Sequence, residues 1–236
     1  MKEKLAIIIP AFNEEESISS VVRNAQKVCE NIGLSHEIIV VNDCSTDNTG
    51  NIIDGLPCTA LHLPVNLGIG GAMQTGFKYA VENNFDFAVQ VDGDGQHPSE
   101  QIPALLSRLK ENNLDVIIGS RFISKEGFQS SAIRRTGIGW FRWINKLLLG
   151  IDIKDSTSGF RMLNRKAISI VSETYPDEYP EPEAIVLFTK NGFTIGEVPI
   201  AMKERQGGQS SIGFFSGIYY MWKVTLGIIF TFIRTK

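Results

Sequence analysis

The sequence feature that most constrains the fold is a regular alternation, up to residue 120, of short apolar runs with segments of helix length. The apolar runs are rich in β-branched residues and end in polar or turn residues; they are Leu5–Pro10, Glu37–Asn42, Phe85–Val91 and Val116–Ser120. The helix-like segments are Glu15–Asn31, Asp47–Gly55, Gly70–Asn83 and Ser99–Asn112. Strands and helices that alternate in this way form right-handed βαβ units. We therefore predict an α/β fold whose mainly parallel sheet is flanked by helices.

Polar motifs follow these runs at the points where the strands should end. Asn-Glu-Glu comes shortly after the first run, and Asn-Asp follows the second. Asp-Gly-Asp-Gly-Gln follows Phe85–Val91, and Ser-Arg follows the Val116 run. Ligands of parallel sheets bind at the carboxyl ends of the strands. The sequence thus predicts an active site at this edge of the sheet.

The pattern changes after residue 120. Ser130–Gly150 is predicted to be a helix with aromatic and basic residues, and Glu181–Asn191 a second helix. Asp155–Asn164 is first polar and then strand-like, and Phe193–Met202 has the alternation of a strand. The tail, Ser216–Arg234, is almost wholly apolar. We predict one domain over residues 1–212 and a peripheral apolar or amphipathic C-terminal helix over residues 213–236.

Charge and cysteine usage exclude several classes of protein. The chain has 23 basic and 26 acidic residues, a net charge of −3, and no zinc-finger or RNA-binding signature, so no nucleic-acid partner is expected. Its cysteines, Cys29, Cys44 and Cys58, are scattered and form no Cys-x-x-Cys pair, which favours a reducing compartment. The apolar run before Pro10 is too short for a signal peptide. The expected location is therefore the cytoplasm.

Asp92-Gly93-Asp94-Gly95-Gln96 is the strongest single motif. Two carboxylates one residue apart at the end of a strand can share a divalent cation such as Mg²⁺ or Mn²⁺, with substrate phosphates as further ligands. A plain Asp-Gly turn is the alternative. Duplication of Asp-Gly directly after a buried strand favours binding of a metal and a diphosphate. The neighbouring His97 is either a ligand or a structural residue that acts behind the ligands.

Other strand-end residues are candidates for nucleotide contacts. Capping of the next helix explains Ser45, Thr46 and Asp47 but not Asp43, so a base or ribose contact is expected for Asp43. The acids after Pro10 are also explained as the first turn of a helix. The glycine-rich turn Asn66–Ala72 either brings backbone N–H groups to phosphates or is a tight turn with close packing, and both interpretations stay open.

A site that binds a diphosphate needs permanent positive charge, which arginine supplies in a bidentate fork. The candidates are Arg121, Arg134, Arg135, Arg161 and Arg205, with a solvated surface role as the alternative for each. If the reaction takes a proton from a hydroxyl group, a carboxylate must accept it, and Glu181 and Glu183 are the candidates. A proline-bounded turn with solvated acids is the alternative for both.

The three tryptophans fall in two segments that resemble membrane-surface sequences. Trp140 and Trp143 lie among Phe, Leu, Arg and Lys residues, and Trp222 lies in the apolar tail, which has Lys223 inside it. Aromatic rings with flanking cations suit the boundary between lipid headgroups and acyl chains. A core helix and an interface with another protein chain are the alternatives. The tail is borderline in length for spanning a bilayer.

The ordered set of motifs resembles family 2 inverting glycosyltransferases of the GT-A fold. The resemblance is strongest to the branch of dolichol-phosphate mannose synthases and bacterial polyprenyl-phosphate glycosyltransferases, and it covers about residues 5 to 212. The motifs that carry it are IIIPAFNEEESI, VVNDCSTDNT, NLGIGGA, VDGDGQHP, GSRF, DSTSGFRM and EVPIAMKERQGGQSSI.

The resemblance implies a GT-A (Rossmann-like) sheet, a nucleotide-sugar donor with UDP favoured, Mg²⁺ or Mn²⁺, and a polyprenyl-phosphate acceptor. The implied donor-binding residues are Pro10, Asn13, Glu14, Asp43, Gly68, Asp92 and Gly93. The implied metal ligands are Asp92, Asp94 and Gln96. The acceptor phosphate is assigned to Arg121, Arg134, Arg135, Ser158 and Arg205. The catalytic group is predicted to be Asp92, Asp94, Arg121, Arg205 and Glu183.

The chain departs from this family pattern in two respects. The resemblance implies that Gly207–Ser211 forms a loop that closes over the donor. Gly208-Gln209-Ser210-Ser211 stands where the family has Gly-x-Ser-Lys, so this loop lacks a cation. Many relatives continue into transmembrane helices, so this chain is expected to lie on the inner membrane face, to bind a small membrane protein or to self-associate through its C-terminal helix. A glycosyltransferase that extends a lipid-linked saccharide and a non-catalytic scaffold that binds a membrane partner are the alternative functions.

Overall fold

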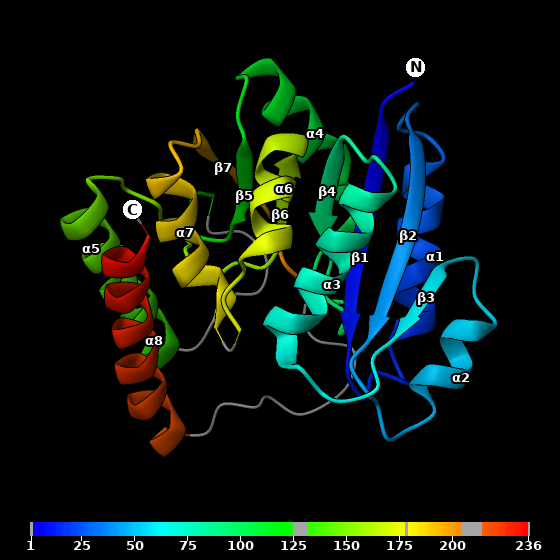
Figure 1. Cartoon of the computed structure of the whole chain (residues 1–236), viewed down its shortest axis with the longest axis horizontal. Coiled ribbons are helices and arrows are strands. Elements are labelled where there is room, and N and C mark those ends of the chain that lie inside the picture. Colours follow the sequence, from blue (N-terminus) through cyan, green and yellow to red (C-terminus); the bar gives the residue numbers. More distant parts are fainter. Residues whose placement is uncertain (1, 125–131, 178, 204–213, 236) are drawn as a thin grey trace.

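The computed structural model describes residues 2–124, 132–177, 179–203 and 214–235, and these form a sheet of seven strands in the order β3-β2-β1-β4-β6-β5-β7 (Figure 1). The strands are β1 Lys4–Ala11, β2 Ser35–Asn42, β3 Thr59–His62, β4 Phe87–Gln90, β5 Val116–Ser120, β6 Arg161–Asn164 and β7 Ile195–Pro199. All neighbouring pairs are parallel except those of β6, which is antiparallel to β4 and to β5. The predicted mainly parallel sheet is therefore confirmed.

The helices follow the predicted segments with small shifts at their ends. They are α1 Ile18–Cys29, α2 Thr49–Asp54, α3 Gly68–Glu82, α4 Ile102–Glu111 after the 3₁₀ turn η1 Ser99–Gln101, α5 Ala132–Leu149, α6 Arg165–Glu173, α7 Pro180–Lys190 and α8 Phe214–Arg234. Strand β3 and helix α6 were not predicted. β3 has four residues, none of them fully buried, and so gives no apolar run.

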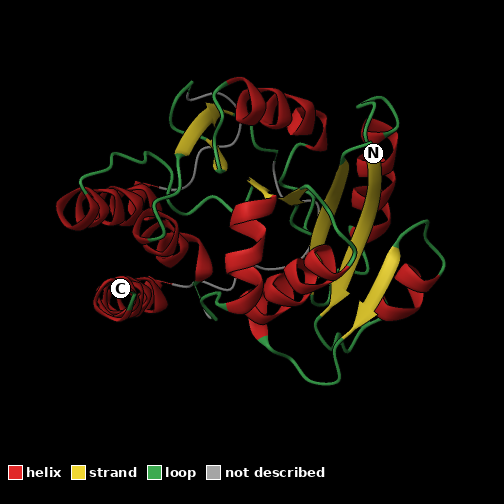
Figure 2. Ribbon diagram, turned by 45° about the horizontal axis from the view of Figure 1, so that its top comes forward, coloured by secondary structure: helices red, strands yellow, loops and turns green. Residues whose placement is uncertain are grey.

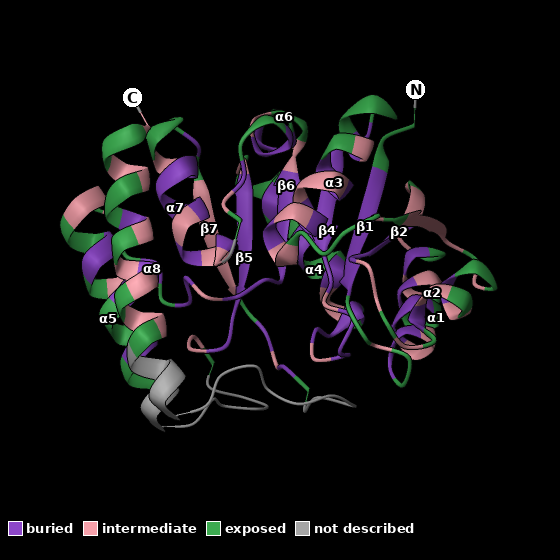
Figure 3. Ribbon diagram, turned by 60° about the horizontal axis from the view of Figure 1, so that its bottom comes forward, coloured by how far each residue is buried: buried purple, intermediate pink, exposed green. Residues whose placement is uncertain are grey.

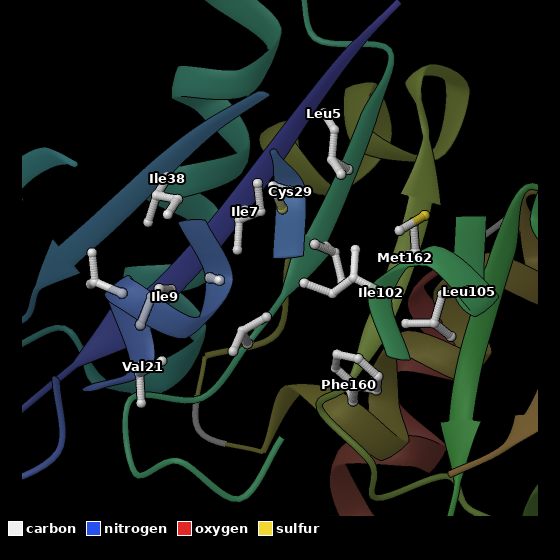
Figure 4. Packing of buried hydrophobic residues seen from close by; sticks show 14 of the residues in the cluster. Leu5, Ile7, Ile9, Val21, Cys29, Ile38, Ile102, Leu105, Phe160 and Met162 are labelled. Atoms are coloured by element: carbon white, nitrogen blue, oxygen red, sulfur yellow. The ribbon is translucent and has the colours of Figure 1, made fainter. Parts of the chain in front are cut away.

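Burial on both faces explains why the central strands are continuous apolar runs. In β1, Leu5, Ile7 and Ile9 join one core with α1, α2 and α4, while Ala6 and Ile8 join a second core with α3, α6 and α7. Figure 4 shows the first core, in which the β1 side chains meet those of α1, α4 and β6. Helices consequently flank the sheet on both sides (Figure 2).

A third apolar cluster joins the two longest helices to the body of the molecule. Phe141 and Ile144 of α5, Val186 of α7, and Val224 and Ile228 of α8 are buried together. Figure 3 shows α5 and α8 next to each other at one side of the molecule, beyond α7. Within the described part of the chain, no helix combines the length and hydropathy needed to cross a bilayer.

The antiparallel strand β6 changes where the chain approaches the site. Because β6 runs opposite to β5, with Ile118 paired to Arg161 and Val116 to Leu163, the chain leaves β5 and enters β6 at the same end of the sheet. That end is the one where the parallel strands finish. The polar segment before β6, residues 155–160, is therefore placed beside the ends of β4 and β5.

Candidate active site

An open cleft of about 390 Å³ lies where β1, β2 and β4 end. Its described lining residues are Pro10, Ala11, Phe12, Glu14, Asp43, Asn66, Gly68, Ile69, Ala72, Asp92, Gly93 and Asp94. The structure thus brings together, in one cleft, most of the residues that the sequence assigned to the donor. Asn13 and Gln96 are not among the lining residues.

The loops that follow β1 and β2 are bound to each other by side-chain hydrogen bonds. Asn13 has a positive φ of 56°, and its Oδ1 accepts the N–H of Thr46 at 2.8 Å. The Asn13 N–H donates to Ser45 Oγ at 3.0 Å, and the Glu14 N–H donates to Thr49 Oγ1 at 2.8 Å. The amide of Asn13, predicted to contact the donor, therefore holds the two loops in place.

Asp43 connects the end of β2 to the turn before α3. Only 3% of the residue is exposed, and its Oδ1 accepts the N–H of Leu67 at 2.7 Å. Asn66 Nδ2 donates to the Asp43 carbonyl at 3.2 Å. A buried carboxylate with backbone support can present its second oxygen at a fixed position to a ligand in the cleft.

The glycine-rich turn is closely packed, and it also borders the cleft. Gly68, with a φ of +75°, lines the cleft. Gly70 donates its N–H to the Asp177 carbonyl at 2.9 Å, and a Cβ at this position would lie 2.1 Å from the Pro176 carbonyl oxygen. Close packing against the backbone before α7 therefore requires a glycine at position 70.

Asp92 is oriented by two neighbours. Gln90 Nε2 donates to Asp92 Oδ1 at 3.0 Å. The Asp92 N–H donates to His97 Nδ1 at 2.9 Å, which leaves the ring proton on Nε2, 3.4 Å from Asp92 Oδ2. Both nitrogens of the buried His97 thus face Asp92, so His97 supports the carboxylate from behind. No sequence pattern indicated the role of Gln90.

Asp94, the second carboxylate of the motif, is buried, whereas Asp92 is partly exposed. Its Oδ1 accepts the N–H of Gln96 at 3.0 Å across Gly95, which has a φ of +77°. Gln96 contributes its backbone here, although the sequence assigned its side chain to a metal.

The donor set at Asp92 and Asp94 fits a hard divalent cation. Among the residues that the structure describes, no group of three or more His, Cys, Asp or Glu side chains is arranged to hold a metal ion. Mg²⁺ in phosphate-binding sites commonly takes one or two carboxylates, with substrate phosphates and water as the other ligands. Asp92 and Asp94 line an open cleft, so the other coordination positions are left to substrate phosphates and water.

A buried polar layer lies behind the cleft. Arg161 is 1% exposed; its Nε donates to the Ser158 carbonyl at 2.6 Å and its Nη2 to the Ser156 carbonyl at 2.8 Å. Burial raises the pKa of Glu181 above its ordinary value, although the Arg161 guanidinium and a hydrogen bond with Gln90 favour its charged form. Arg161 therefore acts inside the protein, and the sequence indicated it only as a possible phosphate ligand.

Arg121 is held by a protein carboxylate. Its backbone N–H, Nε and Nη2 donate to the carboxylate of Asp155 at 3.0, 2.7 and 2.7 Å. Both residues are buried. The structure thus places Arg121, assigned to catalysis and to the acceptor phosphate, in an internal ion pair. Ser158 is also buried, and its hydroxyl has no hydrogen-bond partner among the described residues.

The remaining predicted residues lie away from the cleft or outside the described residues. Glu183 is in the interface of α7 with α8, where it accepts a hydrogen bond from Thr231 Oγ1 at 3.0 Å. It is not placed to act as a base in the cleft. Arg135 is exposed in the first turn of α5. The side chain of Arg134, Arg205 and the loop Gly207–Ser211 are outside the described part of the structure.

The fold and the cleft together define an α/β enzyme domain that binds its ligand at the carboxyl ends of a mainly parallel sheet. Residues 6–170 match the family described as Glycosyl transferase family 2, and the chain belongs to this family. The predicted resemblance and the predicted enzyme class are therefore confirmed.

Two curated relatives match over most of their length. One is the UDP-N-acetylglucosamine–dolichyl-phosphate N-acetylglucosaminyltransferase of Methanococcus voltae, 34% identical over 85% of this chain and 86% of the relative. Another is the polyprenol monophosphomannose synthase of Mycolicibacterium smegmatis, 28% identical over 89% of this chain and 81% of the relative.

A solved structure shares the fold at low sequence identity. Glucosyl-3-phosphoglycerate synthase from Mycobacterium tuberculosis, in complex with Mn²⁺, UDP and glucosyl-3-phosphoglycerate, superposes with a TM-score of 0.71. The two chains are 19% identical, and the match covers 97% of this chain and 80% of the other.

Proposed function

We propose that this glycosyltransferase moves a sugar from a nucleotide-sugar donor to a polyprenyl phosphate, with inversion at the anomeric carbon. The observation that carries the proposal is that Asp92, Asp94 and Asp43 line one cleft at the ends of three strands. Two relatives named for dolichyl-phosphate and polyprenol substrates support the choice of acceptor. UDP is the favoured nucleotide, in agreement with the donor in the name of the first relative.

The donor would lie with its base and ribose near Pro10 and Asp43 and its diphosphate near Gly93. Asp92 and Asp94 would hold Mg²⁺ or Mn²⁺, which when bound offsets the charge that develops on the leaving nucleoside diphosphate. Gln90 and His97 fix the direction of the Asp92 carboxylate, so that it needs little rearrangement when the donor binds.

A phosphate acceptor needs no base at Glu183, which lies in the interface of α7 with α8. A phosphate monoester is ionised near neutral pH and attacks without losing a proton to the protein. Because Arg121 is engaged by Asp155, the cations proposed for the acceptor phosphate are Arg134, Arg135 and Arg205. The acceptor lipid places the reaction at a membrane, for which we propose the cytoplasmic face.

The test is incubation of the protein with Mn²⁺, a polyprenyl phosphate and a panel of labelled nucleotide sugars, followed by measurement of organic-extractable label. The proposal predicts a lipid product that is labile to mild acid, and no product from Asp94→Asn. Label in a lengthened saccharide would instead support the alternative of a saccharide-extending enzyme. Absence of transfer from every donor would contradict the proposal.

A further inference from the structure

The outer face of α8 is apolar along the described part of the helix. Its exposed large side chains are Tyr219, Trp222, Leu226, Ile229, Phe230 and Ile233. They recur every three or four residues and so share one side of the helix. Val224 and Ile228 point to the opposite side, into the cluster with α5 and α7. A helix that is apolar on both sides needs a second neighbour that covers its outer side.

Two tryptophans of α5 continue this surface. The rings of Trp140 and Trp143 stack with centroids 5.3 Å apart, and Trp140 Nε1–H donates to Thr225 Oγ1 of α8 at 3.0 Å. Thr225 lies three residues after Trp222, so the pair borders the outer face of α8. We call the exposed apolar side chains of both helices the α5–α8 patch; they are Trp140, Trp143, Leu147, Tyr219, Trp222, Leu226, Ile229, Phe230 and Ile233.

The charge of these two helices is opposite to that of the rest of the chain. α5 and α8 contain six of the 23 basic residues and none of the 26 acidic ones, which leaves 17 basic residues against 26 acidic ones elsewhere. Asp152 offsets Arg142 from outside the helices, while Arg135, Lys146 and Arg234 are exposed. An aromatic surface with local positive charge attracts anionic lipid headgroups.

We infer that the α5–α8 patch is the surface by which the protein lies on an anionic lipid bilayer. The inference rests on the proposed function, because a polyprenyl-phosphate acceptor is held in a bilayer. Figure 1 shows that α8 begins at the end of the molecule to which the arrowheads of β1 and β2 point, so one end of the patch lies at the end that carries the cleft. A bilayer that covers the patch can therefore present an acceptor phosphate near the donor.

A second copy of the chain fits the patch less well. Paired amphipathic helices bury a narrow stripe and use opposite charges beside it to choose their partner. Here the apolar surface extends across two helices, and neither helix has an acidic residue to pair with the cations of a second copy. Tryptophan and tyrosine with neighbouring cations are instead typical of the membrane–water boundary.

The experiment measures flotation of the full chain with vesicles of phosphatidylcholine, with and without phosphatidylglycerol, over a series of salt concentrations. We expect binding that is about tenfold or more stronger with phosphatidylglycerol and that weakens with salt. The double variant Trp143→Gln, Trp222→Gln should bind about tenfold or more weakly. Lys146→Glu should lose much of the preference for phosphatidylglycerol. Val81→Gln, at an exposed apolar position of α3, is the matched control and should bind like the parent protein.

The outcomes separate this inference from the proposed function. Equal vesicle binding by the double variant and the parent protein overturns the inference. The inference also fails if the parent protein binds no vesicles and forms a dimer that the two substitutions dissociate. Transfer to a short, water-soluble prenyl phosphate in detergent is measured in parallel, and the double variant should keep it. Vesicle binding without transfer by the parent protein would remove the proposed function alone.

Discussion

The buried ion pair of Arg121 with Asp155 allows a quantitative prediction, because the chain carries an exposed pair of the same geometry. The variant Asp155→Ala removes from Arg121, which is only 7% exposed, its counter-charge, two hydrogen bonds of the guanidinium and one of the backbone N–H. Loss of one partner of a buried pair costs about 3–5 kcal/mol. That is a large part of a total stability of roughly 5–15 kcal/mol.

The matched control is Asp152→Ala. Asp152 accepts hydrogen bonds from Arg142 Nε and Nη2 at 2.6 and 2.7 Å, but the two side chains are 42% and 40% exposed. Water can replace either partner there, so the expected cost is below about 1 kcal/mol. The two variants thus differ mainly in burial.

The assay is urea unfolding followed by tryptophan fluorescence. With a slope of roughly 2 kcal/mol per molar urea, Asp155→Ala should lower the unfolding midpoint by about 2 M, and Asp152→Ala by less than about 0.5 M. The double variant Arg121→Met, Asp155→Leu should recover most of the lost stability, since it removes both charges of this buried pair. Equal midpoints for Asp155→Ala and Asp152→Ala would refute the argument that burial makes this arginine a structural residue.

Three further variants test other parts of the structure. Asp94→Asn should nearly abolish transfer without moving the urea midpoint. The control Glu82→Gln, which replaces an exposed acid of α3, should retain full activity. Normal transfer by Asp94→Asn with metal present would remove the metal assignment. Gly70→Ala should lower the stability by about 1–3 kcal/mol, because the new Cβ would meet the Pro176 carbonyl. The control Gly139→Ala, whose Cβ would meet no atom within 4 Å, should be neutral or stabilising by about 0.5–1 kcal/mol. Thermal unfolding compares the two variants, and equal melting temperatures would disprove the steric argument. Burial alone would raise the pKa of Asp115, but hydrogen bonds from Thr194 and Asn164 and the charge of Lys166 lower it below its ordinary value. The ionised carboxylate therefore stabilises the fold above its unfolded pKa of about 3.9, and this contribution is lost as the pH falls through the lower pKa of the folded state. Asp115→Asn should therefore cost about 1–3 kcal/mol at neutral pH and progressively less in acid, as measured by unfolding at several pH values; a cost that does not change with pH would contradict it.

The sequence predicted those parts of the fold whose local pattern reflects their burial. β1 is apolar throughout because both of its faces are covered, and α1 and α4 show the helical spacing of one buried face. β3 was missed because it is a short, half-exposed edge strand. The antiparallel direction of β6 was not predictable, since a run such as Arg161–Asn164 reads the same in either direction.

The site was predicted as far as it depends on the ends of strands. Pro10, Asp43 and Asp92 meet in the cleft because parallel strands finish at one edge of the sheet. Pairings between distant segments were not visible in the sequence: Arg121 is 34 residues from Asp155, and Asn13 is 33 residues from Thr46. Because of these contacts, the side chains of Arg121 and Asn13, which were predicted to bind ligands, have structural roles.

The direction of β6 has a consequence for the surface of α5 and for the strands that support the cleft. Helix α5 belongs to a connection that starts and finishes at one edge of the sheet, as a long hairpin loop does. Its length and surface can differ between related chains while the pairing of the strands that support Asp43 and Asp92 stays the same. The exposed apolar surface of α5 can thus vary without a change in the strands that support Asp43 and Asp92.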